Sequence, residues 1–353
     1  MQNSESLKFD RETLNTLARR VAIGFASFVI LVFIIVAALW GDRPQLDEID
    51  WQPYPVYESR ADAVTVTWLG VATMLFDDGN TQILIDGFFS RPSVADILFS
   101  ANVQSNAAQI NRVLDEYRMR RLAAIIPVHS HFDHAMDIGA IANRSSASII
   151  GSTSTANIAR GSGVPEDQIV VAENNQAYEF GEFTVRIIPS NHAPIGWGGS
   201  VPYAGSIDEP LTVPTPVSTY REGQSYSIVV AHPQGTTLVQ GSAGFLPGAL
   251  DDVVADVVML GVFGLENLGR KYSEQFWLSL VTSTGAKRVL PIHFDDYTRP
   301  FGSIELGPRF IDNFVDSAMW LDEIRETWDN DVRLHLPKFG EKLVLYPPSI
   351  PDA

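Results

Sequence analysis

The hydrophobic and polar positions along the chain divide it into one long apolar run near the N-terminus and a succession of short periodic segments after it. From Val64 onward the short β-type runs VTVTWL, ATMLF and TQILID follow one another, and Asp78-Gly79-Asn80 predicts a hairpin turn between the last two. Further strands are predicted at AAIIPV, SASIIG, EFTVRIIPS, DVVMLGV and KRVLPI, with a hairpin at YSIVVAHPQGTTLVQGS. Helices are predicted over Ala107–Arg120, Ala135–Asn143, Ser154–Arg160, Ser273–Thr284 and 308–325. This alternation predicts a layered α/β domain.

The apolar run, Val21–Trp40, is long enough to cross a bilayer as a single helix. Only Gly24 and Ser27 interrupt it, and a helix of this length reaches roughly 30 Å, the thickness of the hydrocarbon core. A cleaved signal peptide is the alternative, but its apolar core is usually shorter, about 7–15 residues. The segment Ala37-Ala38-Leu39 also matches poorly the pattern of small residues that precedes a signal-peptide cleavage site. The sequence therefore favours an uncleaved transmembrane anchor.

The charges on either side of this run predict its orientation. Residues 1–20 carry Lys8 and three arginines, whereas residues 41–60 carry only Arg43 and Arg60. Because basic flanks stay on the cytoplasmic side, we predict a short cytoplasmic tail over 1–20 and the anchor over 21–40. A linker over 41–63, one large domain over 64–346 and a tail over 347–353 then lie on the outer side, periplasmic or extracellular.

Composition and charge narrow the classes of function. The 353 residues are 45% hydrophobic, which is enough to bury a core, and carry 25 basic against 42 acidic side chains, a net charge of −17. Residues 44–353 alone carry 20 basic against 38 acidic side chains, or −18, so nucleic acid is not a predicted partner. The same acidity repels anionic lipid head groups, which leaves membrane attachment to the anchor. The chain has no cysteine, which excludes disulfides, thiolate zinc sites, iron–sulfur clusters and a cysteine nucleophile.

The segment PVHSHFDH holds the densest cluster of chemically active side chains. It places His129, His131, Asp133 and His134 within six positions, directly after an apolar strand. Side chains on a strand-to-helix turn can converge on one point, which this spacing does not allow in a regular helix or strand. Imidazole and carboxylate are the ligands of zinc, with manganese and iron as second choices. A chance cluster of surface histidines is the alternative, but these are three of only seven histidines in the chain.

Two more histidines follow predicted strands in the same way. His192 comes after EFTVRIIPS and His293 after KRVLPI, so both are candidate ligands at the carboxyl ends of buried strands. His232, in a hairpin turn, and His335, in a C-terminal strand, are predicted to be structural. Between Ala193 and 224 the chain turns rich in Gly, Pro and Ser without periodicity, which is typical of an active-site loop.

The order of these residues resembles that of the metallo-β-lactamase superfamily. Its members carry a His-x-His-x-Asp-His motif, a later single histidine and a terminal histidine. The segments WLGVATMLF and ILIDGFFSRP resemble the branch of ascorbate-6-phosphate lactonase-like and N-acylphosphatidylethanolamine phospholipase D-like hydrolases. The resemblance covers about Val64 to Tyr346. It implies a four-layer αββα sandwich with the metal site at one edge.

By matched position, the resemblance also implies two ligand sets. His129, His131 and His192 would hold the first zinc, and Asp133, His134 and His293 the second. Asp86, at the end of the ILID strand, would orient a ligand histidine. His131 stands where the di-iron members carry Glu, which favours zinc over iron.

Two positions depart from the family pattern. Ser242, in QGSAG, stands where the bridging Asp is expected, and Val71 stands where a histidine often follows Trp-Leu-Gly. A neutral hydroxyl supplies no negative charge between two cations, so we predict one tightly bound zinc and a weaker second. Asp295 or Asp296, in the turn after His293, are possible replacements for the bridge.

The predicted function is metal-assisted hydrolysis. A zinc ion with an open position lowers the pKa of its bound water from about 15.7 toward 7, and Asp133 is the predicted catalytic residue that orients this water or accepts its proton. The expected partner is a small-molecule or lipid-like ester, lactone, amide or phosphodiester. A catalytically weak metal-binding or scaffold protein is the alternative, and a nuclease is disfavoured by the acidity.

Overall fold

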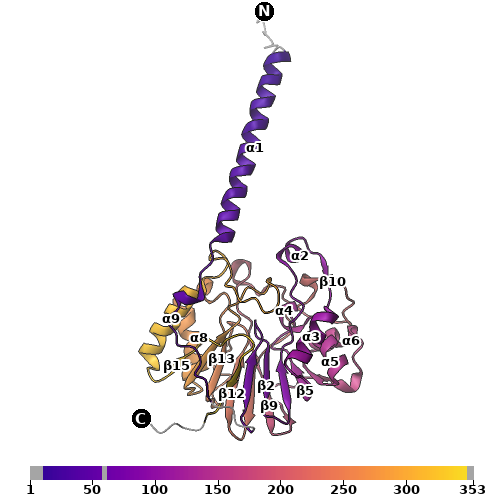
Figure 1. Ribbon diagram of the computed structural model, residues 1–353, viewed down its shortest axis with the longest axis vertical. Helices are drawn as coiled ribbons and strands as arrows, with labels where there is room; N and C mark the ends of the chain where they lie inside the picture. The colour runs from indigo at the N-terminus through magenta and orange to yellow at the C-terminus, as the bar shows by residue number, and fades with distance from the viewer. Residues whose placement is uncertain (1–10, 58–61, 348–353) are drawn as a thin grey trace, which may run out of the picture.

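Two seven-stranded sheets pack against each other in the computed structural model, which describes residues 11–57 and 62–347 (Figure 1). The first sheet has the order β16 (Lys342–Val344), β1 (Thr65–Trp68), β2 (Met74–Asp77), β3 (Gln82–Ile85), β5 (Leu122–Ile126), β6 (Ser148–Gly151), β7 (Ile169–Val171). The second has the order β15 (Arg333–Leu334), β14 (Arg288–Ile292), β13 (Val257–Gly261), β12 (Gly235–Gln240), β11 (Ser225–His232), β9 (Phe183–Ser190), β8 (Ala177–Phe180). Short strands β4 (Asn102–Val103) and β10 (Thr215–Pro216) pair separately.

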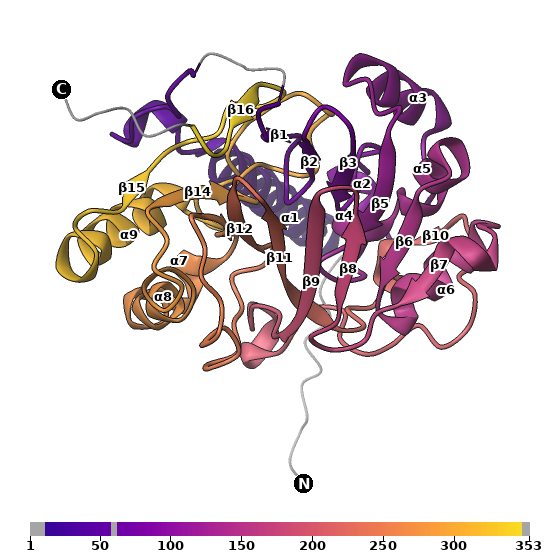
Figure 2. The ribbon, with the colours of Figure 1, turned by 90° about the horizontal axis from the view of Figure 1, so that it is seen from below.

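Helices cover the outer faces of both sheets. The helices that follow α1 are α2 (Val94–Leu98), α3 (Ala107–Glu116), α4 (Phe132–Ala135), α5 (Ile138–Ser145), α6 (Thr153–Gly161), α7 (Leu265–Leu268), α8 (Arg270–Trp277) and α9 (Phe314–Trp328). Figure 2 shows α3, α5 and α6 outside the first sheet and α7, α8 and α9 outside the second. The predicted four-layer αββα sandwich is confirmed.

Alternation along the central strands explains the layers. Leu75 and Leu84 pack in one cluster with residues of α3 and α5, whereas Phe76 and Ile85 join the larger core with residues of β9 and β11. Successive side chains of a strand point to opposite faces, so a sheet covered on both sides needs apolar residues at nearly every position. The burial of every residue of β2 and β3 fits this rule.

The N-terminal helix α1 (Arg11–Gly41) projects from one end of the domain (Figure 1). It contains the predicted span Val21–Trp40, and none of its residues is buried. By length and composition it could cross a membrane, and a signal sequence would meet the same description. Lys8 of the predicted cytoplasmic tail lies outside the described residues, as do residues 58–61 of the predicted linker and 348–353 of the predicted tail.

The described part of the predicted linker packs on the domain. Arg43 Nη1 lies 2.8 Å from Asp296 Oδ2, and the buried Tyr54 donates its hydroxyl hydrogen bond to Val344 O at 2.7 Å. Pro53 also forms a bridge with Leu336. These partners lie more than 200 residues away along the chain, so the local pattern of prolines and charges could not reveal them.

The observed helix boundaries differ from the predicted ones. Helix α3 ends at Glu116 and not at Arg120, and α5 begins at Ile138 and not at Ala135. Two further helices differ as well. The helix predicted over 308–325 begins only at Phe314, because Arg309 N donates to Asp42 O and the next residues turn around Pro308. The helix predicted over Ser273–Thr284 is α8, which starts at Arg270 and continues after Trp277 as a wider π-helical turn, Leu278–Thr282. The predicted hairpins are confirmed, with Asp77 opposite Gln82 and His232 opposite Gly235.

Candidate metal centre

The PVHSHFDH segment forms a sharp turn between β5 and α4, at the carboxyl end of this interior strand of the first sheet. Val128 N donates to Asp86 Oδ1 at 2.8 Å, and Ser130 N donates to Glu222 O at 3.0 Å, which fixes the turn from two sides. His131 is the N-cap residue of the four-residue helix α4, so the chain changes direction between His129 and Asp133. This change lets four side chains so close in sequence face a common space.

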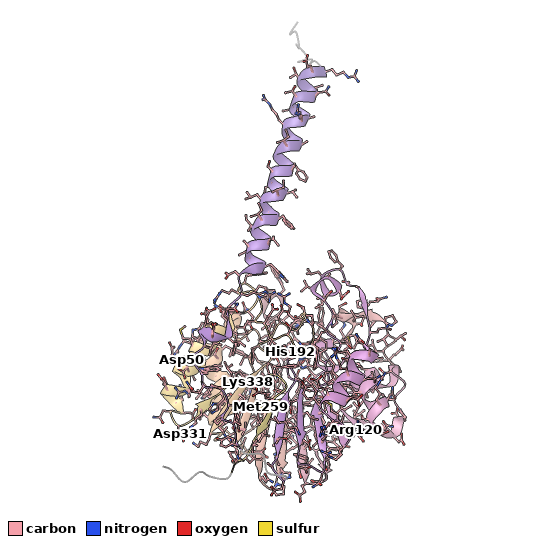
Figure 3. All side chains as sticks on the ribbon, viewed as in Figure 1. Asp50, Arg120, His192, Met259, Asp331 and Lys338 are labelled. Carbon is pink, nitrogen blue, oxygen red and sulfur yellow. The ribbon has the colours of Figure 1, made fainter. Side chains whose placement is uncertain are left out.

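The first group of candidate ligands is His129, His131 and His192, whose ligand atoms lie within 4.8 Å of one another. His129 Nε2 is 2.9 Å from His131 Nδ1. His192 lies just beyond β9, in the part of the domain nearer α1 (Figure 3). Its Nδ1 is 2.7 Å from Ala193 O, so the ring donates there and leaves Nε2 with a free lone pair.

The second group is Asp133, His134 and His293, also within 4.8 Å of one another. Asp133 Oδ2 lies 3.2 Å from His293 Nε2 and 3.4 Å from His134 Nε2. Asp86 Oδ2 lies 2.7 Å from His134 Nδ1, in the orienting role predicted for it. The structure thus brings together, in two groups of three, all six residues predicted as metal ligands.

The two groups differ in protonation. Burial lowers the pKa of His129 well below its ordinary value, that of His131 to about 4 and that of His192 to about 3, so these rings are neutral at pH 7. Burial alone would raise the pKa of Asp133, but His134 and His293 hold it well below its usual range. Burial alone would lower the pKa of His134, but Asp133 and Asp86 raise it above its ordinary value, so a cation bound to the second group would displace a proton from this ring. Imidazole and carboxylate donors fit zinc, and the first group already has the neutral imidazoles that zinc binds.

A cavity of about 520 Å³ opens over the two groups. It is lined by His131, Phe132, Asp133, His192, Ile195, Pro202, Tyr203, Ser242, Ala243, Phe263, His293 and Tyr297. Ile195, Pro202 and Tyr203 come from the Gly/Pro-rich segment, so this segment borders the cavity, and its role as an active-site loop stays a prediction. Phe263 and Tyr297 were not predicted from the sequence, although Phe263 follows the end of β13 much as His293 follows β14.

Sequence comparisons give distant relatives, and no family model matches the chain. A UPF0173 metal-dependent hydrolase of Pyrobaculum islandicum is 22% identical over 237 residues, covering 66% of this chain and 84% of that protein. Another, from Pyrobaculum aerophilum, is 24% identical over 238 residues with the same coverage. An uncharacterized protein of Mycobacterium tuberculosis is 26% identical over 167 residues, 46% of this chain. The chain matches only 43% of the length of that mycobacterial relative.

Solved structures with a similar arrangement include the metallo-beta-lactamase fold protein YhfI of Bacillus subtilis. It is 15% identical with a TM-score of 0.47, over 80% of this chain and 99% of that chain. Igni18, a metallo hydrolase of Ignicoccus hospitalis, is also 15% identical, with a TM-score of 0.46 over 79% and 97%.

The two-sheet sandwich, the converging His and Asp side chains and the aligned metal-dependent hydrolases agree with one another. The chain thus has the sandwich architecture and the grouping of candidate ligands expected from its resemblance to the metallo-β-lactamase superfamily, and the proteins it aligns with are named metal-dependent hydrolases. Ser242, which stands where the resemblance leads us to expect the bridging Asp, lines the cavity. Ser242 Oγ accepts a hydrogen bond from Ala193 N at 2.9 Å, next to the candidate ligand His192.

Asp295 and Asp296 do not replace the missing carboxylate. Asp295 accepts hydrogen bonds from Val71 N at 2.7 Å and from Arg91 at 3.1 Å, and Asp296 pairs with Arg43. Neither lines the cavity over the metal groups. The suggestion that one of them bridges two metals is therefore wrong, because each carboxylate already forms an ion pair with an arginine side chain. Asp295 instead fixes the backbone of Val71 through its hydrogen bond with Val71 N. The carbonyl of Val71 in turn accepts a hydrogen bond from His293 N at 2.8 Å.

His232 belongs to a third group, with Asp78 and Glu182, away from this cavity. Gln234 N donates to His232 Nδ1 at 3.2 Å, so a neutral His232 ring carries its proton on Nε2. That nitrogen lies 3.3 Å from Glu182 Oε2 and would have to give up its proton before binding a metal. We therefore retain His232 as a structural residue. His335, which contacts Tyr54 and Gln52, is in none of the three groups found among the described residues.

Proposed function

We propose that this protein is a membrane-anchored, zinc-dependent hydrolase of an ester, lactone, amide or phosphodiester. The observation that supports it most is the convergence of two three-residue groups, His129/His131/His192 and Asp133/His134/His293, beneath one cavity. The catalytic unit in this proposal is 64–346, and α1 holds it at the membrane. The basic residues before the span favour a cytoplasmic N-terminus and a catalytic domain on the outer side.

The chain's own residues would position the reaction. A divalent ion held by the two groups would supply Lewis acidity and lower the pKa of a coordinated water toward 7. Asp133 is ionised and lines the cavity, where it can orient a water or accept its proton. Asp86 and the carbonyl of Ala193 fix the rings of His134 and His192, so both rings are preorganised. Phe132, Tyr203 and Tyr297 would pack against the substrate.

Zinc is the metal we propose, because the donor set contains five imidazoles and one carboxylate and no thiolate is available. The neutral side chain of Ser242 at the cavity wall, where a bridging carboxylate is expected, supports the proposal of one tightly bound ion. The group His129, His131 and His192 needs no bridging anion, whereas two dications about 3.5–4 Å apart repel unless an anion lies between them.

A catalytically weak metal-binding protein of the same fold is the second candidate, favoured by Ser242. The two candidates are separated by turnover. The full-length protein in detergent is incubated with a panel containing a phosphodiester, an acyl ester, a lactone and an amide, with and without a chelator. We expect hydrolysis of at least one class, lost with chelator and restored by zinc. Tight zinc binding with no turnover of any class would favour the second candidate.

Replacing Ser242 by Asp is expected to raise the number of tightly bound zinc ions from about one toward two. The new carboxylate would lie at the cavity wall, where it can still accept the hydrogen bond from Ala193 N and adds the missing negative charge. Zinc titration of Ser242→Asp and of the unmodified protein measures the change, and Ser242→Asn, of similar size but neutral, is the control. Two equally tight ions in the unmodified protein would contradict this prediction.

A further inference from the structure

A second cavity adjoins the metal pocket. Its open space is about 410 Å³, which includes space continuous with the solvent, and its walls include Phe263 and Tyr297, which also line the metal pocket. Phe263 stacks on the candidate ligand His293, with ring centroids 5.3 Å apart, and lies 5.8 Å from the ring of Tyr297. These two aromatic side chains therefore form the boundary between the two cavities.

The opposite end of the second cavity reaches the base of α1. Trp40, the last residue of the predicted span, is one of its walls, together with Val94 and Ile311. The cavity thus extends from the last residue of the apolar run to the aromatic boundary of the metal pocket. A Trp at the end of a membrane span typically lies at the interface between lipid and water.

Several contacts fix α1 relative to this cavity. The ring of Trp40 lies 6.1 Å from that of Phe310, and Arg43 pairs with Asp296 and donates to Leu306 O at 2.7 Å. Arg309 N also donates to Asp42 O at 2.9 Å. If α1 spans a bilayer, these contacts hold the cavity against the membrane surface.

The walls of the cavity suit an uncharged chain. Two of its three carboxylates are paired, Asp295 with Arg91 and Asp296 with Arg43. The third, Asp312, is buried with no cation beside it, and burial raises its pKa to about 7. The remaining walls are mainly apolar or aromatic, such as Val94, Phe263 and Ile311.

Exposed apolar side chains lie at the same end of the domain. Helix α2 stands at the end from which α1 leaves (Figure 1), and its Leu98 and the following Phe99 are 69% and 83% exposed. Phe310, beside Trp40, is 55% exposed. Apolar side chains grouped around the base of an apolar helix are expected where a domain rests on a lipid surface.

We propose that the second cavity binds an acyl chain of a bilayer lipid, with the carbonyl end of the chain beside Phe263 and Tyr297 and its terminal end toward Trp40 and the membrane. The polar linkage of the same lipid would then reach the metal pocket. This inference rests on the proposed function for the meaning of that linkage, but occupancy of the cavity by an acyl chain does not require turnover.

Photo-crosslinking in a bilayer tests the proposal. Full-length protein is reconstituted into phosphatidylcholine vesicles containing a trace of phosphatidylcholine with a diazirine near the carbonyl end of one acyl chain. After irradiation, crosslinked peptides are mapped by mass spectrometry. We expect adducts on α1, on the peptide containing Phe263 and on the peptide containing Ile311. Adducts confined to α1 would overturn the proposal.

A matched pair of variants sharpens the result. Val94→Trp fills the cavity from its wall, whereas Val254→Trp makes the same change at a side chain that is 80% exposed and lines neither cavity. We expect Val94→Trp to lower the Phe263 adduct at least fivefold relative to the α1 adducts, and Val254→Trp to leave it unchanged. Equal adduct yields in the two variants would contradict the proposal, and if Val94→Trp does not fold, the unmodified protein alone decides.

The metal-free protein separates this proposal from the proposed function. Chelator-treated protein should give the same adducts, because no ligand of the two metal groups is needed to hold the chain. Adducts at Phe263 without turnover of any substrate class would leave the lipid site standing and remove the hydrolase. Turnover with adducts only on α1 would do the reverse.

Discussion

Substituting alanine for His131 or for Asp133 is expected to abolish hydrolysis. His131 contributes one of three neutral imidazoles to the first group, and its loss leaves a metal site with two protein ligands. Asp133 is the only carboxylate among the six candidate ligands. It is also the group proposed to accept the proton of the attacking water. Loss of a positioned general base typically costs about 10²–10⁴-fold in rate.

The control for both variants is His335→Ala. His335 is a buried histidine that contacts Tyr54 and the carbonyl of Gln52, so its removal tests for a nonspecific effect of deleting an imidazole. We expect it to retain activity when kcat/KM is measured on the substrate found in the panel, well below the unfolding temperature. Equal losses in all three variants would show that stability, and not chemistry, governs the result.

The second large effect concerns membrane attachment. Full-length protein is expected to remain in the pellet after carbonate extraction, and a chain that begins near Trp51 is expected to be soluble. The reason is the charge-free run Val21–Trp40, whose helix has no buried residue in the structure. The shortened chain keeps the hydrogen bond of Tyr54 but loses the pair between Arg43 and Asp296.

The topology of the anchor has its own readout. A reporter fused after Ala353 should be active only in the non-cytoplasmic compartment, because the basic residues precede the span. N-terminal sequencing of the mature protein provides the opposing result. A new terminus just after Ala38 would identify the run as a cleaved signal peptide and exclude the anchor.

Much of the fold is predictable from local patterns. Runs such as TQILID and DVVMLGV are apolar at nearly every position, which is typical of strands covered on both faces, and both are buried strands. The turn at Asp78-Gly79-Asn80 and the hairpin around His232 follow from residues that favour tight turns. The six candidate ligands were also visible, because each follows an apolar strand or lies in the turn after one.

What the sequence could not show depends on contacts between distant segments. Asp295 pairs with Arg91, 204 residues away, and Asp296 pairs with Arg43, 253 residues away. No pattern in the neighbouring sequence indicates either pair. The same holds for Phe263 and Tyr297, which border both cavities only because β13 and β14 are neighbours in the sheet. The late start of α9 likewise depends on the bond from Arg309 N to Asp42 O.

Zinc content measured by mass spectrometry of the purified full-length protein, beside His131→Ala and Asp133→Ala, tests the metal centre most directly. We expect close to one tightly bound zinc per unmodified chain and far less in His131→Ala, which lacks a ligand of the first group. Asp133→Ala should keep the tight ion but lose the weaker second one at excess zinc. Zinc content that is unchanged in both variants would contradict the placement of the site at these residues.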